Sequence, residues 1–237
     1  MAAPINSIPI IDADTHVVEP PDLWTSRLSS RWGDLVPHVR WDDGKGEEAW
    51  FIGDDRLGAV GAAAMAGWPE YPPDHPRRWS DTDRTTWDPV ARLAVLDDYN
   101  VAAQVLYPNV AVFNAKSIVA LDDAALRLAC IQAYNDYLTD FSAAAPGRYV
   151  PISALPFWDL GLTLAEMERT AAMGHKGVAF TQDPSHFGQP VLTDRHWDPL
   201  WASAQEKGCR STSTSRPARS TCSTWATRTT ACTPTTP

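Results

Sequence analysis

The chain has 237 residues, of which 44% are hydrophobic and 21% are charged, and its formal net charge is −9. This composition excludes a disordered chain, a coiled coil and a disulfide-stapled miniprotein. The acidic balance and the absence of a basic stripe argue against nucleic acid as a partner, because nucleic-acid binding requires neutralisation of phosphates.

The last 29 residues differ in composition from the rest. Residues 209–237 contain ten Thr, five Ser and four Arg, but no acid, Lys, Leu, Ile, Val, Met or Phe. All 29 acids and 16 of the 20 bases lie in residues 1–208, which therefore carry −13. We interpret residues 1–208 as the folded part and residues 209–237 as a disordered or frameshifted tail, because a GC-rich gene read out of frame gives such a composition. Translating the other two frames beyond codon 208 tests the frameshift.

The sequence carries no targeting or membrane signal that we can identify. The N-terminus lacks a basic region followed by a long apolar run, so we expect no signal peptide. The weakly apolar stretch at residues 57–68 is too short to cross a bilayer. Cys130 lies in an apolar helical pattern and is expected to be a buried, inert thiol, and the tail cysteines match no zinc motif. We expect a cytoplasmic protein with no membrane partner.

The first part of the chain reads as one strand followed by a long insertion. The run from Ile8 to Asp14 is typical of a buried parallel strand that ends in acids. Residues 20–88 are rich in Pro, Trp, Asp and Gly and show little periodicity. Within them, residues 48–52 and 56–60 flank a Gly-Asp-Asp turn and predict a hairpin. The many Trp residues of the insertion are expected to pack it onto the main body.

From residue 87 onward, helical and strand patterns alternate. Asp88-Pro89 and Asp198-Pro199 each predict a helix N-cap followed by Pro at the first helical position. The predicted elements are, in order, a helix from Asp88, a strand at 101–107, a helix at 121–144, a strand at 149–154, a helix at 162–173 closed by Gly174, a strand at 177–180 and a helix ending at Gly208.

This alternation predicts a parallel sheet with helices outside it. A complete (β/α)8 TIM barrel needs roughly 250 residues before insertions. Without the insertion, residues 1–208 leave 139 residues, enough for about four βα units of ~30 residues each. We therefore expect the first half of a barrel.

The most informative cluster follows the first strand. Asp14 and His16 are two residues apart, so on a strand they share a face and can point together into the mouth of the sheet. A carboxylate with an imidazole is a common ligand pair for Zn²⁺ or Mn²⁺, and barrel active sites lie at this end of the strands. The alternative is structural: Asp14 caps the turn and His16 packs beneath the insertion.

Several segments in order make the chain resemble the amidohydrolase-related family, which includes aminocarboxymuconate-semialdehyde decarboxylase and resorcylate-type decarboxylases. The resemblance covers residues 8–208 and rests on IIDADTHVVEP, LDDYNVAAQVLYPN, AYNDYLTDF, GRYVPISALPFWD, MGHKGVAF and HWDPLWASAQEKG.

The resemblance implies a metal-dependent distorted (β/α)8 barrel whose first-strand ligand pair falls on Asp14 and His16. It implies a hydrolase or non-oxidative decarboxylase of a small carboxylated or cyclic substrate, with a homodimer in intact members. The family's further His ligand and its Asp ligand, which also acts as acid/base, belong to strands beyond the fourth unit. No His or Asp follows Gly208. The catalytic acid/base is therefore unassigned, and we expect this chain to be inactive.

Four further residues are candidate substrate contacts. Tyr107 ends the second strand, and Gln182 follows the fourth, so both are expected to line the mouth of the site. His186 lies in the next loop, where a solvated His is the ordinary alternative. Glu19 lies one turn beyond His16 and either supports the ligands or faces substrate. His175 precedes a strand at the opposite end and is expected to be structural.

Two rival interpretations remain. Asp12-Ala13-Asp14 after an apolar strand resembles the phosphotransfer motif of haloacid-dehalogenase-like phosphatases, but His16 stands where that motif has Thr or Val. The other rival is an inert fragment or binding remnant, because an open half-barrel exposes an unpaired strand edge that favours aggregation or dimer pairing.

Overall fold

The main body of the protein is a five-stranded parallel sheet. The computed structural model describes residues 8–110, 115–181 and 183–214. The strand order is β1-β5-β6-β7-β8, and every neighbouring pair is parallel. The strands are β1 (Ile10–His16), β5 (Val101–Tyr107), β6 (Tyr149–Ala154), β7 (Gly177–Thr181) and β8 (Arg210–Thr214). Strand order follows chain order without a reversal, as in a barrel rather than a doubly wound sheet.

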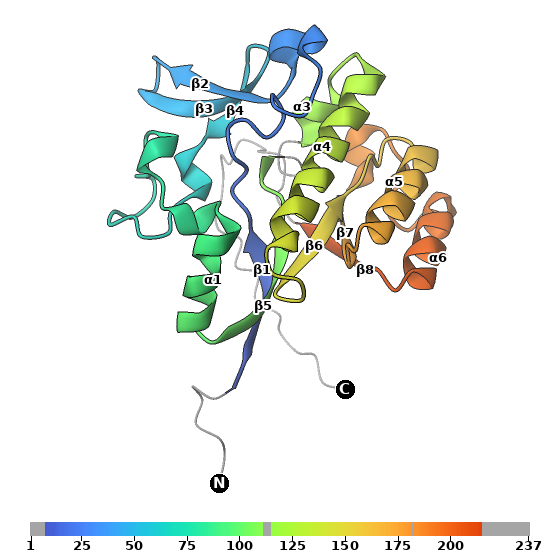
Figure 1. Ribbon diagram of the computed structural model, residues 1–237. Helices are drawn as coiled ribbons and strands as arrows, with labels where there is room; N and C mark the ends of the chain where they lie inside the picture. The colour runs from blue at the N-terminus through green and yellow to red at the C-terminus, as the bar shows by residue number, and fades with distance from the viewer. Residues whose placement is uncertain (1–7, 111–114, 182, 215–237) are drawn as a thin grey trace, which may run out of the picture.

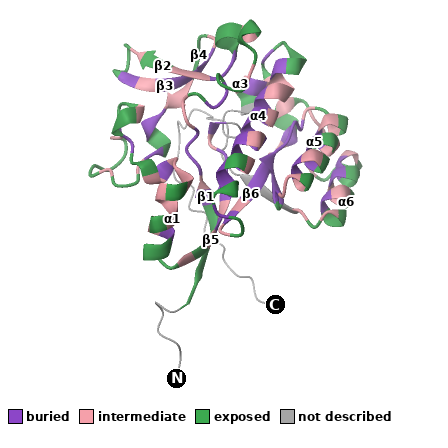
Figure 2. Cartoon of the chain, viewed as in Figure 1, coloured by how far each residue is buried: buried purple, intermediate pink, exposed green. Residues whose placement is uncertain are grey.

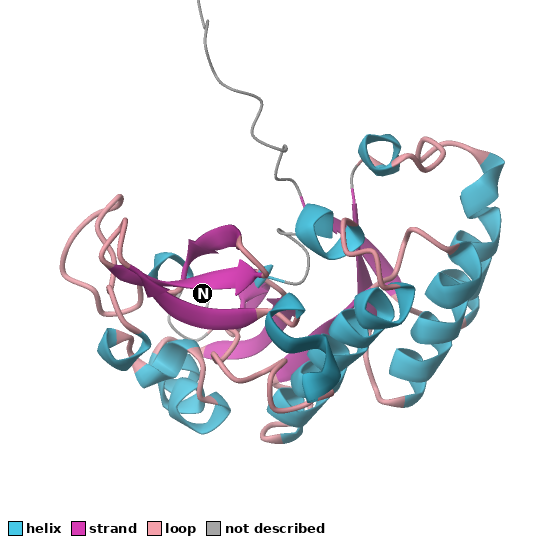
Figure 3. Cartoon of the chain, turned by 90° about the horizontal axis from the view of Figure 1, so that it is seen from above, coloured by secondary structure: helices cyan, strands magenta, loops and turns pink. Residues whose placement is uncertain are grey.

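Helices connect successive strands and lie along one side of the sheet (Figures 1 and 3). They are α1 (Pro89–Asp98), α3 (Ala115–Val119), α4 (Ala124–Ala143), α5 (Leu160–Ala172) and α6 (Asp198–Glu206). The largest apolar cluster joins α1 and α4 to β5 and the insertion, and a second joins α5 and α6 to β7. The predicted alternation of helix and parallel strand is thus confirmed for the described residues.

Three of the described α-helices begin at an Asp cap. Asp88 accepts hydrogen bonds from the amides of Val90 and Ala91 at 2.9 and 3.0 Å and starts α1, as predicted. Asp123 and Asp159 do the same for α4 and α5. Because these caps set the boundaries, α4 begins three residues later than predicted, and α5 begins two residues earlier.

The predicted cap at Asp198 is wrong by one residue. The N-cap of α6 is Trp197, which makes no side-chain cap hydrogen bond, and Asp198 is the first helical residue. The preceding short helix Arg195–Trp197 is capped by Asp194, so the chain already turns before Asp198 is reached. Asp198 keeps only its favourable position near the positive end of the helix dipole.

The insertion forms a second, antiparallel sheet over the carboxyl end of β1 (Figure 1). The predicted hairpin is confirmed as β3 (Glu47–Ile52) and β4 (Asp55–Ala59), and β2 (His38–Asp42) adds a third strand that we did not predict. Trp24 fixes the insertion to the main body: its Nε1 donates to the Cys130 carbonyl at 2.9 Å, and its ring packs edge-on against Trp50. The predicted packing role of the insertion tryptophans holds here.

The boundary predicted at Gly208 lies one strand too early. Residues 210–214 form β8, which pairs in parallel with β7 from Gly177 to Thr181. Strand pairing uses backbone N–H and C=O groups, and Ser and Thr are compatible with it, so a sequence without large apolar residues still extends the sheet. The other residues of the predicted tail, 215–237, lie outside the described residues.

The first strand is less buried than we predicted. β1 forms an edge of the sheet, and its N-terminal half is exposed (Figure 2): Ile10 is 51% and Ile11 70% accessible. The strand also runs two residues further than expected, because its pairing with β5 continues to His16.

Within the described part of the chain, no helix has the length and apolar character needed to cross a bilayer.

Candidate metal centre at the end of strand β1

Asp14 and His16 lie together at the carboxyl end of β1. Nε2 of His16 is 3.8 Å from Oδ1 of Asp14, and Nδ1 of His16 is 3.0 Å from the carbonyl oxygen of Pro108. Because a carbonyl oxygen only accepts, Nδ1 carries the hydrogen in this contact, and in the neutral imidazole Nε2 carries the lone pair. A metal-ligating His usually donates its other ring N–H to a backbone carbonyl or a carboxylate, and the contact of Nδ1 with the Pro108 carbonyl has this form.

A bulge in β1 sets the direction of this pair. Between Asp12 and Thr15 the register against β5 shifts, because three steps along β1 match two along β5. Asp12 stabilises the bulge: its carboxylate accepts hydrogen bonds from the Thr15 hydroxyl, from Gln104 Nε2 at 3.1 Å and from the Asp14 amide at 3.3 Å. Burial alone would raise the pKa of Asp12, but these hydrogen bonds outweigh it and lower the pKa below its ordinary value. Bulges often re-aim side chains at sites of this kind.

Tyr107 and Glu19 take different positions around this pair. Tyr107 is opposite His16 in the β1–β5 register, and the two ring centroids are 5.8 Å apart. Glu19 differs from the expected substrate contact, because it is 1% exposed and its Oε1 accepts from the amides of Asn109 and Val110 at 2.8 and 2.9 Å. Its carboxylate therefore holds the loop that follows β5, which also supplies the Pro108 carbonyl.

The other two predicted substrate residues lie after β7. His186 is in the short helix Pro184–Phe187, its side chain is 65% exposed, and its Nε2 lies 3.3 Å from Oδ2 of Asp183. This ion pair favours the solvated alternative over a buried contact. Gln182 lies outside the described residues.

The types of donor atom at this site fit a divalent metal, but the site has few protein ligands. Asp14 and His16 supply one carboxylate and one imidazole, the ligands that Zn²⁺ and Mn²⁺ accept. Across the described ranges no group of three or more His, Cys, Asp and Glu side chains is arranged to hold a metal. Two protein ligands leave the remaining coordination positions to water, so we expect weak binding.

Arg92 is a supporting residue that the sequence analysis missed. It lies on α1, and its Nη2 donates to the His16 carbonyl at 3.1 Å, so it helps to fix the backbone of the candidate ligand. The spacing of apolar residues in α1 identifies Arg92 only as a helical residue near the apolar face and predicts no contact with His16. The contact joins residues 76 positions apart and needs the folded structure to be seen.

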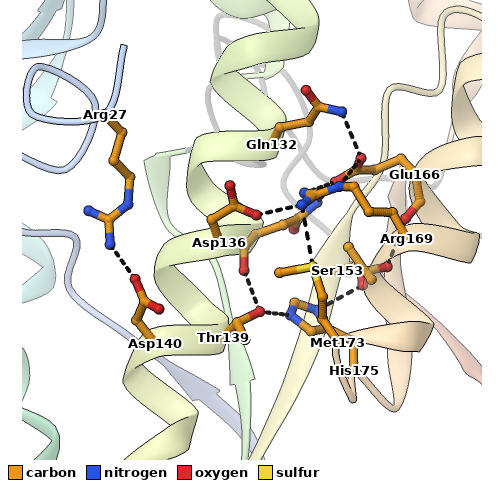
Figure 4. Close-up of polar contacts among 12 residues, drawn as sticks. Arg27, Gln132, Asp136, Thr139, Asp140, Ser153, Glu166, Arg169, Met173 and His175 are labelled. Carbon is orange, nitrogen blue, oxygen red and sulfur yellow. Dashed lines mark hydrogen bonds and ion pairs between the residues drawn. The ribbon is translucent and has the colours of Figure 1, made fainter.

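His175 and Glu166 belong to a polar cluster between α4, α5 and β6 (Figure 4). Nε2 of His175 contacts the Thr139 hydroxyl, and Nδ1 contacts the Ser153 hydroxyl, both at 2.9 Å. The Thr139 hydroxyl itself donates to the Asn135 carbonyl, so it accepts from Nε2–H. Burial first, and the Arg169 charge second, lower the pKa of His175 to about 4. The predicted structural role of His175 is thus confirmed.

Glu166 is the buried carboxylate of the same polar cluster. Its side chain is 1% exposed and accepts hydrogen bonds from Asn135 Nδ2, Gln132 Nε2 and the Arg169 guanidinium (Figure 4). Arg169 also pairs with Asp136 at 2.6 Å. The buried carboxylate is therefore satisfied, and the cluster ties α4 to α5.

Cys130 is fully buried, and burial raises its pKa to about 12, as expected for an inert thiol.

Solved structures share this fold. The chain is similar to an amidohydrolase from Mycobacterium avium subsp. paratuberculosis, with a TM-score of 0.66 and 21% identity over 87% of this chain and 59% of that one. It is also similar to 4-oxalomesaconate hydratase from Rhodopseudomonas palustris (TM-score 0.50, 17% identity, 85% and 51% covered). A third similar structure is 5-carboxyvanillate decarboxylase from Novosphingobium aromaticivorans with bound manganese (TM-score 0.50, 14% identity, 87% and 51% covered).

The chain spans between half and three-fifths of the length of these three structures. Together with the sequential parallel strands, this confirms the expected partial (β/α)8 barrel. The sequence also matches the family model described as amidohydrolase over residues 11–210, a range that begins in β1 and ends in β8. This match sets aside the phosphatase interpretation of Asp12 and Asp14. The chain belongs to the amidohydrolase family.

Proposed function

We propose that this chain carries the first-strand metal ligands of a metal-dependent hydrolase or non-oxidative decarboxylase. The observation that carries the proposal is the His16 imidazole, fixed at Nδ1 by the Pro108 carbonyl and directed with Nε2 toward Asp14. Zn²⁺ and Mn²⁺ both suit this donor pair. The manganese in the similar decarboxylase structure supports the choice of ion.

The residues of the site have separate tasks. Asp14 and His16 hold the ion, the Pro108 carbonyl fixes the imidazole, and Arg92 fixes the His16 carbonyl. When bound, such an ion supplies Lewis acidity, which polarises a substrate carbonyl or carboxylate, or activates water. Tyr107 stands beside His16 and gives substrate a flat contact surface, and we keep Gln182 and His186 as proposed substrate contacts.

For the substrate we propose a small carboxylated or cyclic molecule. The names of the similar decarboxylase and hydratase structures support this class. The net charge of −9 supports a small-molecule substrate over nucleic acid. We further propose a cytoplasmic location and no membrane partner, and a homodimer for an intact family member.

A second candidate function is ligand or metal binding without catalysis. The two-donor set favours it, because the described residues hold neither a third metal ligand beside Asp14 and His16 nor an assigned acid/base. The two candidates differ in one measurement. Release of CO₂ or hydrolysis product from small aromatic carboxylates by the metal-loaded chain supports the enzyme, and binding without turnover supports the second candidate.

Equilibrium dialysis with Mn²⁺ or Zn²⁺ tests the metal site. We expect the wild-type chain to bind about one ion weakly, and Asp14→Asn and His16→Gln each to weaken binding by at least tenfold, in line with the cost of losing a ligand or its support. His38→Gln is the control: His38 lies on β2 and bonds the Val36 carbonyl at 2.9 Å, away from Asp14. Unchanged affinity in both site variants removes these residues from the site.

A further inference from the structure

A cavity of about 310 Å³ lies between α1, the insertion and the β1–β5 pair. Its polar lining comes from His16, Thr85, Thr86, Arg92 and Gln104, and its apolar lining from Val18, Met65, Val95 and Leu96. This volume is at the lower end of the range for small-molecule sites. The mixture of apolar walls with a few converging polar groups is also typical of such sites.

The cavity opens on the opposite face of β5 from Tyr107. Side chains alternate along a strand, so Gln104 and Leu106 share one face, and Val105 and Tyr107 share the other. Leu106 packs with Leu96 and the α4 residues, whereas Val105 and Tyr107 pack with strand residues only. The cavity therefore lies on the helix-covered side of the sheet, whereas Tyr107 belongs to the other face of β5. His16 lines the cavity, and its ring centroid is 5.8 Å from that of Tyr107.

Arg92 brings a positive charge to this cavity. Its guanidinium donates to the carbonyls of His16 and Thr86, at 3.1 and 3.5 Å, and forms no ion pair with any carboxylate of the described residues. Asp12 acts on it only from beyond ion-pair distance and is itself held by Thr15 and Gln104. Arg92 is half-buried and its charge has no ion-paired carboxylate among the described residues, so an anion in the cavity would be stabilised.

Gln104 adds a buried acceptor to the same cavity. The residue is 8% exposed, its Nε2 donates to Asp12, and its Oε1 has no hydrogen-bond partner in the structure. A buried carbonyl oxygen without a donor costs free energy, and such exceptions call for an explanation. A hydroxyl or amino group in the cavity would satisfy it.

We propose that this cavity binds a small hydroxy- or amino-carboxylate, with its carboxylate on Arg92 and its hydroxyl or amino group donating to Gln104 Oε1. The two groups require opposite partners, an acceptor for the guanidinium and a donor for the amide oxygen. A small α-hydroxy or α-amino acid supplies both within the available volume. The cavity shares His16 in its lining with the proposed metal pair, but the proposed ligand contacts are Arg92 and Gln104 and need no metal.

Calorimetric titration of the metal-free full-length chain tests the proposal with three probes. Glycolate carries both groups, acetate carries only the carboxylate, and ethylene glycol carries only hydroxyls. We expect glycolate to bind saturably, acetate to bind about tenfold more weakly because it leaves Oε1 without a donor, and ethylene glycol not to bind. In metal-free protein the probes cannot bind to an ion held by Asp14 and His16, so failure of either proposal leaves the other standing.

Two variants assign the contacts. Arg92→Gln is expected to abolish glycolate binding, and Gln104→Leu to bring the affinity for glycolate down to that for acetate. Arg127→Gln is the matched control, because Arg127 also donates to a backbone carbonyl, that of Val119, but does not line the cavity. If Arg92→Gln reduces the folded fraction of the protein, the ratio of the affinities for glycolate and acetate in Gln104→Leu still tests the proposal. Equal binding of glycolate and ethylene glycol, an unchanged ratio in Gln104→Leu, or no binding of any probe overturns the proposal.

Discussion

At the residue scale, two hydrogen bonds between distant positions of the chain hold His16. The Pro108 carbonyl holds its Nδ1, and Arg92 holds its own carbonyl. The sequence could predict that Asp14 and His16 meet, because their spacing and the surrounding motif are local. It could not predict the supporting contacts, which join positions 92 and 76 residues apart, or the burial of Glu19 beneath the loop after β5.

The buried His175 gives the fold a pH dependence. Its pKa of about 4 in the folded chain lies below the ordinary 6.5, so the unfolded chain binds this proton at higher pH. The contribution of His175 to the free energy of unfolding is complete above about pH 6.5 and is lost as the pH falls toward 4. Between pH 7 and pH 5 we expect a loss of ~2 kcal/mol from this group.

Urea unfolding of the wild-type chain and of His175→Gln at both pH values measures this contribution. Other titrating groups affect both chains alike, so the difference between the two pH-dependent losses isolates His175. The wild-type chain should lose more stability on acidification than the variant. Equal losses in the two chains contradict the assigned pKa.

At the element scale, caps decide where the helices begin. Apolar periodicity correctly predicts α1, β5, α4, β6, α5, β7 and α6 in this order but misses α3, and the strands 101–107 and 149–154 are confirmed to the residue. Periodicity cannot fix the ends, because a cap depends on backbone angles at a single residue. The two Asp-Pro pairs show this: Asp88 has extended angles and caps α1, whereas Asp198 has helical angles and lies inside α6.

This contrast predicts different costs for the same substitution. Asp88→Ala removes two cap hydrogen bonds and should lower the free energy of unfolding by about 1 kcal/mol. Asp198→Ala removes only a helix-dipole interaction and should cost about 0.5 kcal/mol. Thermal unfolding of the two variants beside the wild-type chain measures both. A larger loss for Asp198→Ala would contradict the cap assignment.

At the scale of the whole molecule, the sheet is open at β1. The half-barrel could be predicted from length and alternation, because each βα unit has a characteristic length. The third strand of the insertion and β8 could not, because their sequences lack the apolar runs that mark buried strands. Among the described residues β1 pairs with β5 alone, so Ile10 and Ile11 are exposed on an edge whose outward N–H and C=O groups have no strand partner there.

The exposed edge predicts concentration-dependent self-association. Ile11→Lys places a charge on the edge strand and should shift the chain toward the monomer. Val90→Lys is the matched control, because Val90 is 68% exposed on α1, away from the sheet edge. Sedimentation velocity over a range of protein concentrations compares the three chains. Equal association of wild type and Ile11→Lys contradicts an edge-mediated contact.

The proposed metal centre depends on coordination of the ion by His16. Pulsed electron paramagnetic resonance of the Mn²⁺-loaded chain tests it most directly, because a coordinated imidazole nitrogen modulates the electron spin echo. We predict ¹⁴N modulation in the wild-type chain and in His38→Gln, and its loss in His16→Gln. Modulation that persists in His16→Gln, or a wild-type spectrum without nitrogen coupling, would contradict the assignment of His16 as a ligand.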